Sequence, residues 1–192
     1  MGLFSKKKKK TNAEIFLEYL EELFGGEPQD IHVADAKDGG PSVSVLIWYD
    51  IPEEGYMTAV TYGLSESNHP DWKYGKPELM LSLHTKDKDW GISMAVFANS
   101  FAGEKSFTYC SVFTTDIPIS KESDMCGFFV FAPSILEREQ AQVHMPDYTV
   151  NISGMYPIYM EEVAVLEEIG LEKFWHHDNF DMYNVNRKRI CG

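Results

Sequence analysis

Runs of hydrophobic residues, alternating or continuous, predict most of the strands in this chain. Leu79, Leu81 and Leu83 alternate with other residues, which is the period of a strand with one face on a core. The segment 58–64 precedes them across a polar loop, and the segment 42–49 ends in a continuous apolar run typical of a strand buried on both faces. Further strands are predicted at 31–34, 107–113, 126–131 and 148–153.

Helical spacing predicts the remaining elements. Thr11 and Glu14 form a capping box, and the apolar stripe that follows ends at Gly25. A second helix is predicted from Asp87 or Asp89 to about Phe101, and because it is apolar nearly all round we expect it to be buried in the fold. Two more helices are predicted at 159–169 and 171–177, and the segment 134–142 is either a short helix or a surface excursion between strands.

These elements predict one α/β domain over residues 11–192, with a mixed β-sheet of about six to eight strands and helices packed on it. The chain of 192 residues is long enough to bury a sizeable core. Residues 1–10 are predicted to be a flexible basic tail, because Lys6 to Lys10 form an unbroken lysine run.

Two groups of residues resemble the suppressor of fused domain family. The segment Thr61-Tyr62-Gly63-Leu64-Ser65, then a polar loop, then Glu78-Leu79 at the head of a strand of leucines, is similar to the family pattern. The C-terminal part of the chain is also similar to that of the family. It has a proline between hydrophobic residues at Pro157, then a helix with an early Glu, a Gly, a shorter helix and an Arg-containing segment at 186–189. The resemblance runs from about Thr11 to Ile190.

The resemblance implies an α/β sandwich and a protein-binding function without catalysis. The animal member of the family is a two-domain regulator that sequesters transcription factors, but this chain spans only the first domain, so the signalling role is not carried over. Single-domain relatives are similar to immunity proteins that neutralise bacterial toxins. The resemblance therefore implies a protein partner, with a toxin domain as the expected one.

Charge favours a basic partner. The net charge is -13, and because the lysine tail contributes five positive charges, residues 11–192 carry -18. Such a domain repels nucleic acid and attracts basic proteins, although solubility alone also explains an acidic chain. We expect no nucleic-acid partner and leave the oligomeric state open.

The loop at 66–76 is the first candidate binding surface. It holds Asp71, Trp72 and Tyr74 between two predicted strands, and exposed Trp and Tyr are the residue types that contribute most binding energy at interfaces. These three residues are predicted to bind the partner. The alternative is that Trp72 folds back over a sheet edge as a lid.

Catalytic and metal-binding patterns are missing from the sequence. Cys110, Cys126 and Cys191 match neither a zinc nor a disulfide spacing, and the neighbouring residues His176 and His177 are badly placed to share a metal. We predict no catalytic residue, metal or cofactor. The alternative function is an enzyme or small-molecule-binding protein with an unrecognised pocket, using Cys110 or Cys126, a histidine such as His84, and a carboxylate.

Targeting signals are also missing. No apolar run approaches the roughly 18 residues that cross a bilayer, no apolar segment follows the lysine run as in a secretory signal, and Lys6 stands where myristoylation needs Ser or Thr. We therefore expect a cytoplasmic protein without a stable membrane anchor. A third interpretation is a membrane-associated scaffold that uses Lys6 to Lys10.

Overall fold

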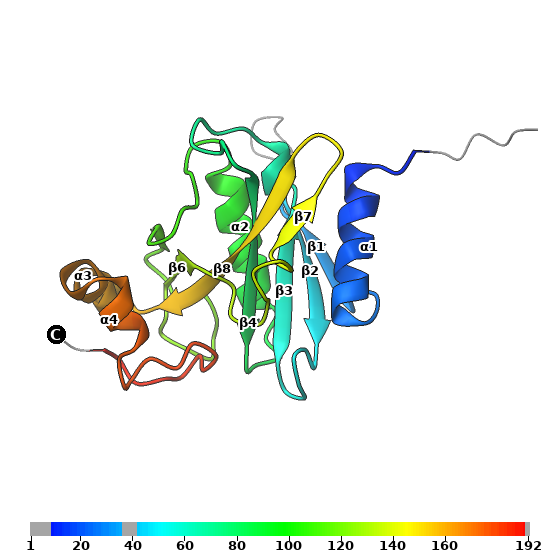
Figure 1. The fold of residues 1–192 in the computed structure, drawn as a ribbon. Helices are drawn as coiled ribbons and strands as arrows, with labels where there is room; N and C mark the ends of the chain where they lie inside the picture. Colours follow the sequence, from blue (N-terminus) through cyan, green and yellow to red (C-terminus); the bar gives the residue numbers. More distant parts are fainter. Residues whose placement is uncertain (1–8, 36–41, 191–192) are drawn as a thin grey trace, which may run out of the picture.

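An eight-stranded mixed β-sheet forms the centre of the protein (Figure 1). The computed structural model describes residues 9–35 and 42–190, so Lys6 to Lys8 of the predicted tail and Cys191 lie outside the described residues. Strands β4 and β8 pair in parallel, and all other pairs are antiparallel. The expected α/β class with six to eight strands is confirmed.

One helix precedes the strands along the chain, others lie between strands, and two follow the last strand. In chain order the elements are α1 Asn12–Phe24, β1 Asp30–Val33, β2 Ser44–Tyr49, β3 Met57–Tyr62, the 3-10 helix η1 Leu64–Glu66, β4 Lys76–Leu83, α2 Asp89–Ser100, β5 Val112–Thr114, β6 Gly127–Phe131, β7 Gln142–His144, β8 Thr149–Ile158, α3 Met160–Ile169 and α4 Leu171–Trp175.

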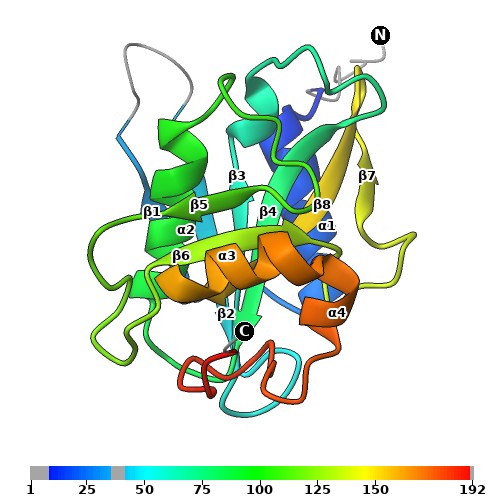
Figure 2. The ribbon, with the colours of Figure 1, turned by 90° about the vertical axis from the view of Figure 1, so that its left-hand side faces the viewer.

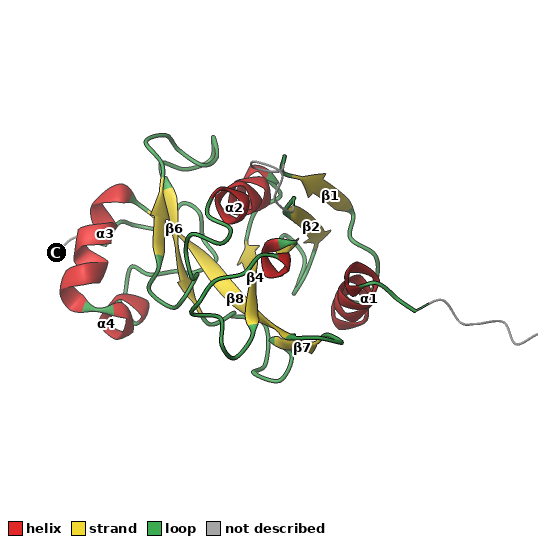
Figure 3. Ribbon diagram, turned by 90° about the horizontal axis from the view of Figure 1, so that it is seen from above, coloured by secondary structure: helices red, strands yellow, loops and turns green. Residues whose placement is uncertain are grey.

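The sheet curves around α2. Its strand order is β1-β2-β3-β4-β8-β6-β5, with β7 added beside β8. Figure 3 shows α2 on one face, while α1 and the pair α3 and α4 lie against the other face at its two ends. No helix in the part of the chain that is described is long and apolar enough to cross a membrane.

Helix α1 begins and ends as the sequence predicts. The Thr11 backbone N–H donates to the Glu14 carboxylate (2.7 Å), and the Glu14 N–H donates to the Thr11 hydroxyl (3.2 Å). Gly25 ends the helix in the left-handed conformation, with φ of 80°. The apolar stripe of α1 packs on the sheet, where Phe24 contacts the ring of Trp48 at 4.9 Å between ring centroids.

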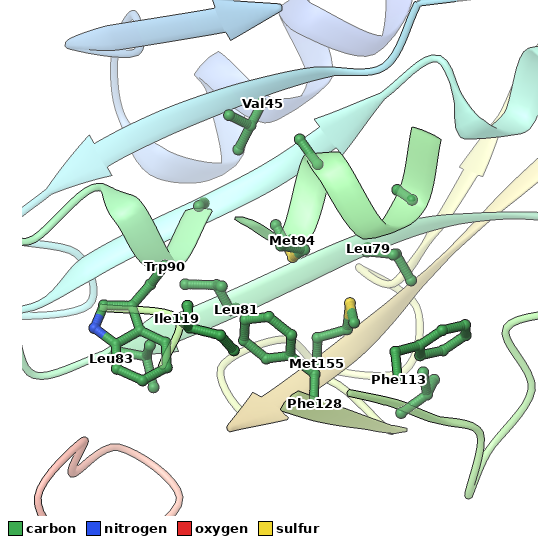
Figure 4. Packing of buried hydrophobic residues seen from close by; sticks show 14 of the residues in the cluster. Val45, Leu79, Leu81, Leu83, Trp90, Met94, Phe113, Ile119, Phe128 and Met155 are labelled. Carbon is green, nitrogen blue, oxygen red and sulfur yellow. The ribbon is translucent and has the colours of Figure 1, made fainter. Parts of the chain in front are cut away.

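Helix α2 covers the opposite face, and Figure 4 shows Trp90 and Met94 among the core side chains of the sheet. Gly91 allows the close approach, because a Cβ there would lie 3.0 Å from the Ala59 Cβ. The expectation that α2 is buried in the fold is wrong for its outer side. Val96 on its outer side is 49% exposed, because the sheet covers only one side of the helix.

The predicted strand at 107–113 is mostly wrong. Only Val112–Thr114 enters the sheet, as β5. Phe107 and Cys110 have positive φ values of 52° and 69°, so the backbone turns where the alternating pattern suggested an extended chain. Phe107 is nevertheless buried, because its ring stacks on Phe113 (4.8 Å).

Between β6 and α3 the chain differs from the prediction in two ways. The segment 134–141 contains no helix and is the surface excursion, and it leads into the unpredicted strand β7. Strand β8 continues through Pro157 to Ile158, well beyond the predicted end at 153. Helices α3 and α4 follow as predicted, and Figure 2 shows α3 alongside β6, with α4 at the end of α3.

Candidate functional site

The residues of the Thr-x-Gly-Leu-Ser pattern build a buried link between β3 and β4. The Glu78 carboxylate is fully buried and accepts hydrogen bonds from the Thr61 hydroxyl (2.6 Å) and from the backbone N–H groups of Gly63 and Ser65 (2.9 Å each). Burial raises the pKa of the Glu78 carboxyl, and these donors oppose the rise without cancelling it. The Glu78 carboxyl group therefore serves as a buried hydrogen-bond acceptor that ties the start of β4 to the end of β3 and to η1.

Gly63 has a backbone that only glycine adopts easily. Its φ is 117°, and a Cβ at this position would lie 2.3 Å from the Ser42 carbonyl oxygen. The close approach lets the chain turn from β3 into η1 while passing against the start of the neighbouring strand. Packing against the Ser42 backbone therefore explains why a glycine stands at position 63 of the pattern that resembles the family.

The early Glu of α3 and the Arg of the terminal segment form a second buried polar link. Arg187 contacts both carboxylate oxygens of Glu162 at 2.6 Å. The Tyr159 N–H (3.1 Å) and the Ile190 N–H (2.7 Å) also donate to this carboxylate. The pair attaches the last described residues to the start of α3, and its side chains are 2% and 0% exposed.

The loop at 66–76 is held at three points. Glu66 at its start accepts hydrogen bonds from the hydroxyls of Tyr62 (2.9 Å) and Tyr148 (3.0 Å). The Trp72 indole N–H donates to the Ser106 carbonyl oxygen (2.7 Å), and Lys76 at the loop's end donates to the Ser67 carbonyl oxygen (2.9 Å). Contacts at both ends and in the middle fix the path of this loop.

The three predicted binding residues lie in different environments. Trp72 is half-buried and packs against the core that contains α2. The Asp71 side chain is 63% exposed and lies 3.7 Å from His69 Nδ1. Tyr74 is 93% exposed. The loop, fixed at three points, thus presents one aromatic ring and one carboxylate to solvent.

Tyr74 lies at the rim of a cavity of about 690 Å³. The other lining residues come from the segment before β5, from the excursion after β6, and from β7 and β8; they are Tyr109, Ala132, Pro133, Leu136, Arg138, Ala141, Gln142, Asn151, Ile152 and Ser153. Tyr109 is 54% exposed and contacts the Phe131 ring (5.2 Å). Two accessible tyrosines and one arginine at a concave surface are the side chains enriched where proteins bind.

Reactive groups are not gathered at this cavity. Its described lining contains no Cys, His, Asp or Glu. Burial raises the pKa of the Cys126 thiol, the opposite of what a nucleophilic thiolate requires. In residues 9–35 and 42–190 there is also no group of three or more His, Cys, Asp or Glu side chains that could hold a metal ion.

The excess of acidic over basic residues is concentrated in the first part of the domain. Between Thr11 and Trp72 the sequence has thirteen Asp and Glu residues and a single basic residue, Lys37; the rest of the chain to residue 192 has seventeen acidic and eleven basic residues. The first stretch forms α1 and strands β1 to β3, drawn from blue to cyan in Figure 1. The field around this part is therefore negative and attracts basic partners.

Comparison with known sequences identifies the family. The sequence model of the suppressor of fused protein (SUFU) family matches residues 39–188, which is most of the chain. The chain belongs to the suppressor of fused family. Among curated proteins, none is similar enough to count as a match.

Solved structures of the family share the fold. A SUFU homologue from Neisseria gonorrhoeae FA 1090 has a TM-score of 0.64 and 16% identity, over 90% of this chain and 93% of that one. A chain of the Sufu–Fu complex has a TM-score of 0.61 and 12% identity, over 90% and 89%. Drosophila suppressor of fused has a TM-score of 0.59 and 12% identity, over 92% of this chain but only 50% of its own length.

Within this family fold, local sequence patterns do not reveal every residue of the candidate surface. The alternating pattern predicts Tyr109 in a strand, and Arg138 falls in the segment that suits either a helix or a surface excursion. Both reach the cavity beside Tyr74 because the chain turns at Cys110 and because the excursion after β6 folds back towards β8. Neither turn has a signal in the hydrophobic pattern.

Proposed function

We propose that this member of the suppressor of fused family is a non-enzymatic, cytoplasmic immunity-type protein that binds a cognate toxin domain of basic charge and covers its active site. The observation that carries the proposal is Tyr74, which is 93% exposed on a tied loop at the rim of a 690 Å³ cavity. Because the loop is already fixed, burying this ring against a partner costs little conformational entropy.

Charge supports a basic partner. The Asp71 side chain, in the same loop as Tyr74, is 63% exposed, and residues 11–192 carry -18. Complementary charge accelerates association and disfavours acidic partners. The similar fold in the Sufu–Fu crystal structure belongs to a complex, which also supports protein binding.

In this proposal the three loop residues have different roles. Tyr74 and Asp71 contact the partner directly, and Tyr109 and Arg138 extend the contact along the cavity. Trp72 positions the loop through its hydrogen bond to the Ser106 carbonyl oxygen. The alternative of an enzyme is less supported, because the described lining of the cavity contains no Cys, His, Asp or Glu that could act as a nucleophile or activate the hydroxyl of Ser153.

A pull-down from the source organism tests the function. The tagged domain is used as bait, with low-salt and high-salt washes in parallel and with Tyr74→Ala as a second bait. Ile117→Ala is the matched control, because Ile117 is 67% exposed and lies outside the cavity lining. We expect one basic protein that is retained at low salt, partly released at high salt, and lost with Tyr74→Ala only.

The retained protein is then purified and assayed for toxicity in cells with and without this domain. Protection by the wild-type domain but not by Tyr74→Ala supports the immunity role. Retention of no protein, or equal retention by the wild-type and Tyr74→Ala baits, would overturn the proposed surface and leave a small-molecule role to be screened.

A further inference from the structure

Strand β1 is an open edge of the sheet. It pairs only with β2, and the Ala34 N–H donates to the Val43 carbonyl oxygen (2.9 Å). Along an antiparallel strand, the backbone N–H and C=O groups of successive residues point alternately to the two sides of the strand. Because the Ala34 N–H points towards β2, the N–H and C=O groups of Ile31 and Val33 point away from β2. Within residues 9–35 and 42–190, no strand pairs with this outer side.

The side chains on this edge are exposed and apolar. Ile31 is 56% and Val33 is 63% exposed, and both lie on the same face of the sheet because they are two residues apart. Natural edge strands are usually protected from pairing by lysine, proline or a cover. The sequence of β1, Asp-Ile-His-Val, contains neither lysine nor proline.

The other face of β1 borders a cavity of about 390 Å³ between this strand and α2. His32 and Asp35 line it from the strand side, and Val96 and Asn99 from the helix. The Nε2 atom of His32 is buried without a hydrogen-bond partner among the described residues, and Val96 is 49% exposed. An added strand would thus find space for its alternate side chains on this face too.

The charge near β1 indicates which kind of strand could pair with its outer edge. Glu27, Asp30 and Asp35 flank or belong to β1, and none of the described residues between Thr11 and Trp72 is a lysine or arginine. A second copy of this chain would bring the same carboxylates together across the new pair, which is repulsive. A strand that carries lysine or arginine is attracted instead.

We infer that the outer edge of β1 binds an extended, basic segment of a partner protein, which adds to the sheet as a ninth strand beside Ile31 and Val33. Backbone hydrogen bonds to these two residues hold the segment, its apolar side chains cover Ile31 and Val33 or enter the cavity beside α2, and its basic side chains face the carboxylates. The inference rests on the proposed function only in taking the partner to be basic, and it uses a different surface from that around Tyr74.

Peptide titration followed by NMR of the amide groups tests this docking site. The probe is an acetylated and amidated octapeptide of alternating lysine and valine. Two control peptides have glutamate in place of lysine, or N-methyl groups that block strand pairing on one side. We expect slowed hydrogen exchange at the Ile31 and Val33 amides with the lysine peptide, and at least tenfold weaker binding of both controls.

Variants locate the site. Val33→Lys is expected to raise the Kd at least tenfold, whereas the matched control Ile117→Lys, at a residue that is 67% exposed, leaves it unchanged. Ile31→Pro removes one outward N–H that makes no bond to β2 and gives the same loss of binding. Tyr74→Ala leaves peptide binding unchanged, which separates a failure of this site from a failure of the proposed function.

Three outcomes would overturn the inference. The first is no saturable binding at millimolar peptide, or shifts confined to residues outside β1. The second is equal binding of the lysine and glutamate peptides. The third is concentration-dependent exchange protection at Ile31 and Val33 without peptide, lost in Val33→Lys, which would make a second copy of the chain the occupant.

Discussion

Arg187 and Glu162 meet in a buried, two-point ion pair although 25 residues separate them in the sequence. The Arg187 guanidinium lies over the rings of Phe180 (5.1 Å to the ring centroid) and Tyr159 (5.4 Å), and the Tyr159 hydroxyl donates to the Arg187 carbonyl oxygen (2.9 Å). The guanidinium thus joins the segment after α4 to the start of α3. Both charges are desolvated, so each depends on the other.

Removing one partner should therefore be costly. We expect Arg187→Ala to lower the free energy of unfolding by about 3–5 kcal/mol, because it leaves the Glu162 carboxylate buried without its countercharge. Arg189→Ala is the control: Arg189 pairs with Asp124 and Glu161 on the surface, where water screens the charges, and its loss should barely change stability. Chemical denaturation of the three proteins measures the difference, and equal stabilities would contradict it.

The pair also shows what the sequence alone predicts. The family resemblance indicated an early Glu in the α3 helix and an Arg in the terminal segment, but nothing in the spacing of Glu162 and Arg187 indicated that they touch. Such a contact depends on how α4 and the following loop turn the chain back. The helix caps at Thr11 and Gly25, by contrast, are local, and the sequence predicted both correctly.

Gly63→Ala tests whether the family pattern is structural. The substitution places a Cβ 2.3 Å from the Ser42 carbonyl oxygen, at a φ of 117° that side chains disfavour. We expect a loss of at least about 2 kcal/mol in the free energy of unfolding, measured by urea denaturation. Gly103→Ala is a milder control, because its nearest atom would lie 3.4 Å away at a φ of 74°. A Gly63→Ala loss no greater than that of Gly103→Ala would show that the close approach relaxes cheaply.

Glu78 gives a pH dependence with a defined sign. Burial raises its folded-state pKa above the ordinary value of 4.5, so the folded protein binds this proton more tightly than the unfolded chain. Its contribution is fully present below pH 4.5 and is lost as the pH rises through the folded-state pKa. Relative to Glu78→Gln, the wild type should therefore lose stability over this range.

The measurement is denaturation at several pH values from 4 upward, for the wild type and Glu78→Gln. The difference between their free energies of unfolding isolates this one carboxyl group from the other titrating residues. A wild type that gains stability over Glu78→Gln as the pH rises would mean that the three donors at Thr61, Gly63 and Ser65 outweigh burial.

The hydrophobic pattern was least informative at α2 and at the loop at 66–76. It predicted a buried helix because apolar residues surround α2, yet Val96 is 49% exposed and lines the cavity beside β1. It also could not distinguish Trp72 from Tyr74, since both are aromatic residues in one polar loop. The difference arises from Ser106, 34 residues away from Trp72, whose carbonyl oxygen accepts the indole N–H.

The last prediction separates these two aromatic residues. Trp72→Ala removes a half-buried ring and its hydrogen bond, so it should lower the free energy of unfolding by about 1–3 kcal/mol, whereas Tyr74→Ala should leave stability unchanged and abolish partner binding. Trp72→Phe keeps the ring without the N–H and should lose about 1 kcal/mol. Denaturation and partner capture are measured on the same preparations. If Trp72→Ala weakened capture of the partner with unchanged stability, Trp72 would contact the partner directly. If Tyr74→Ala destabilised the fold, the loss of binding in this variant would no longer locate the partner at this loop.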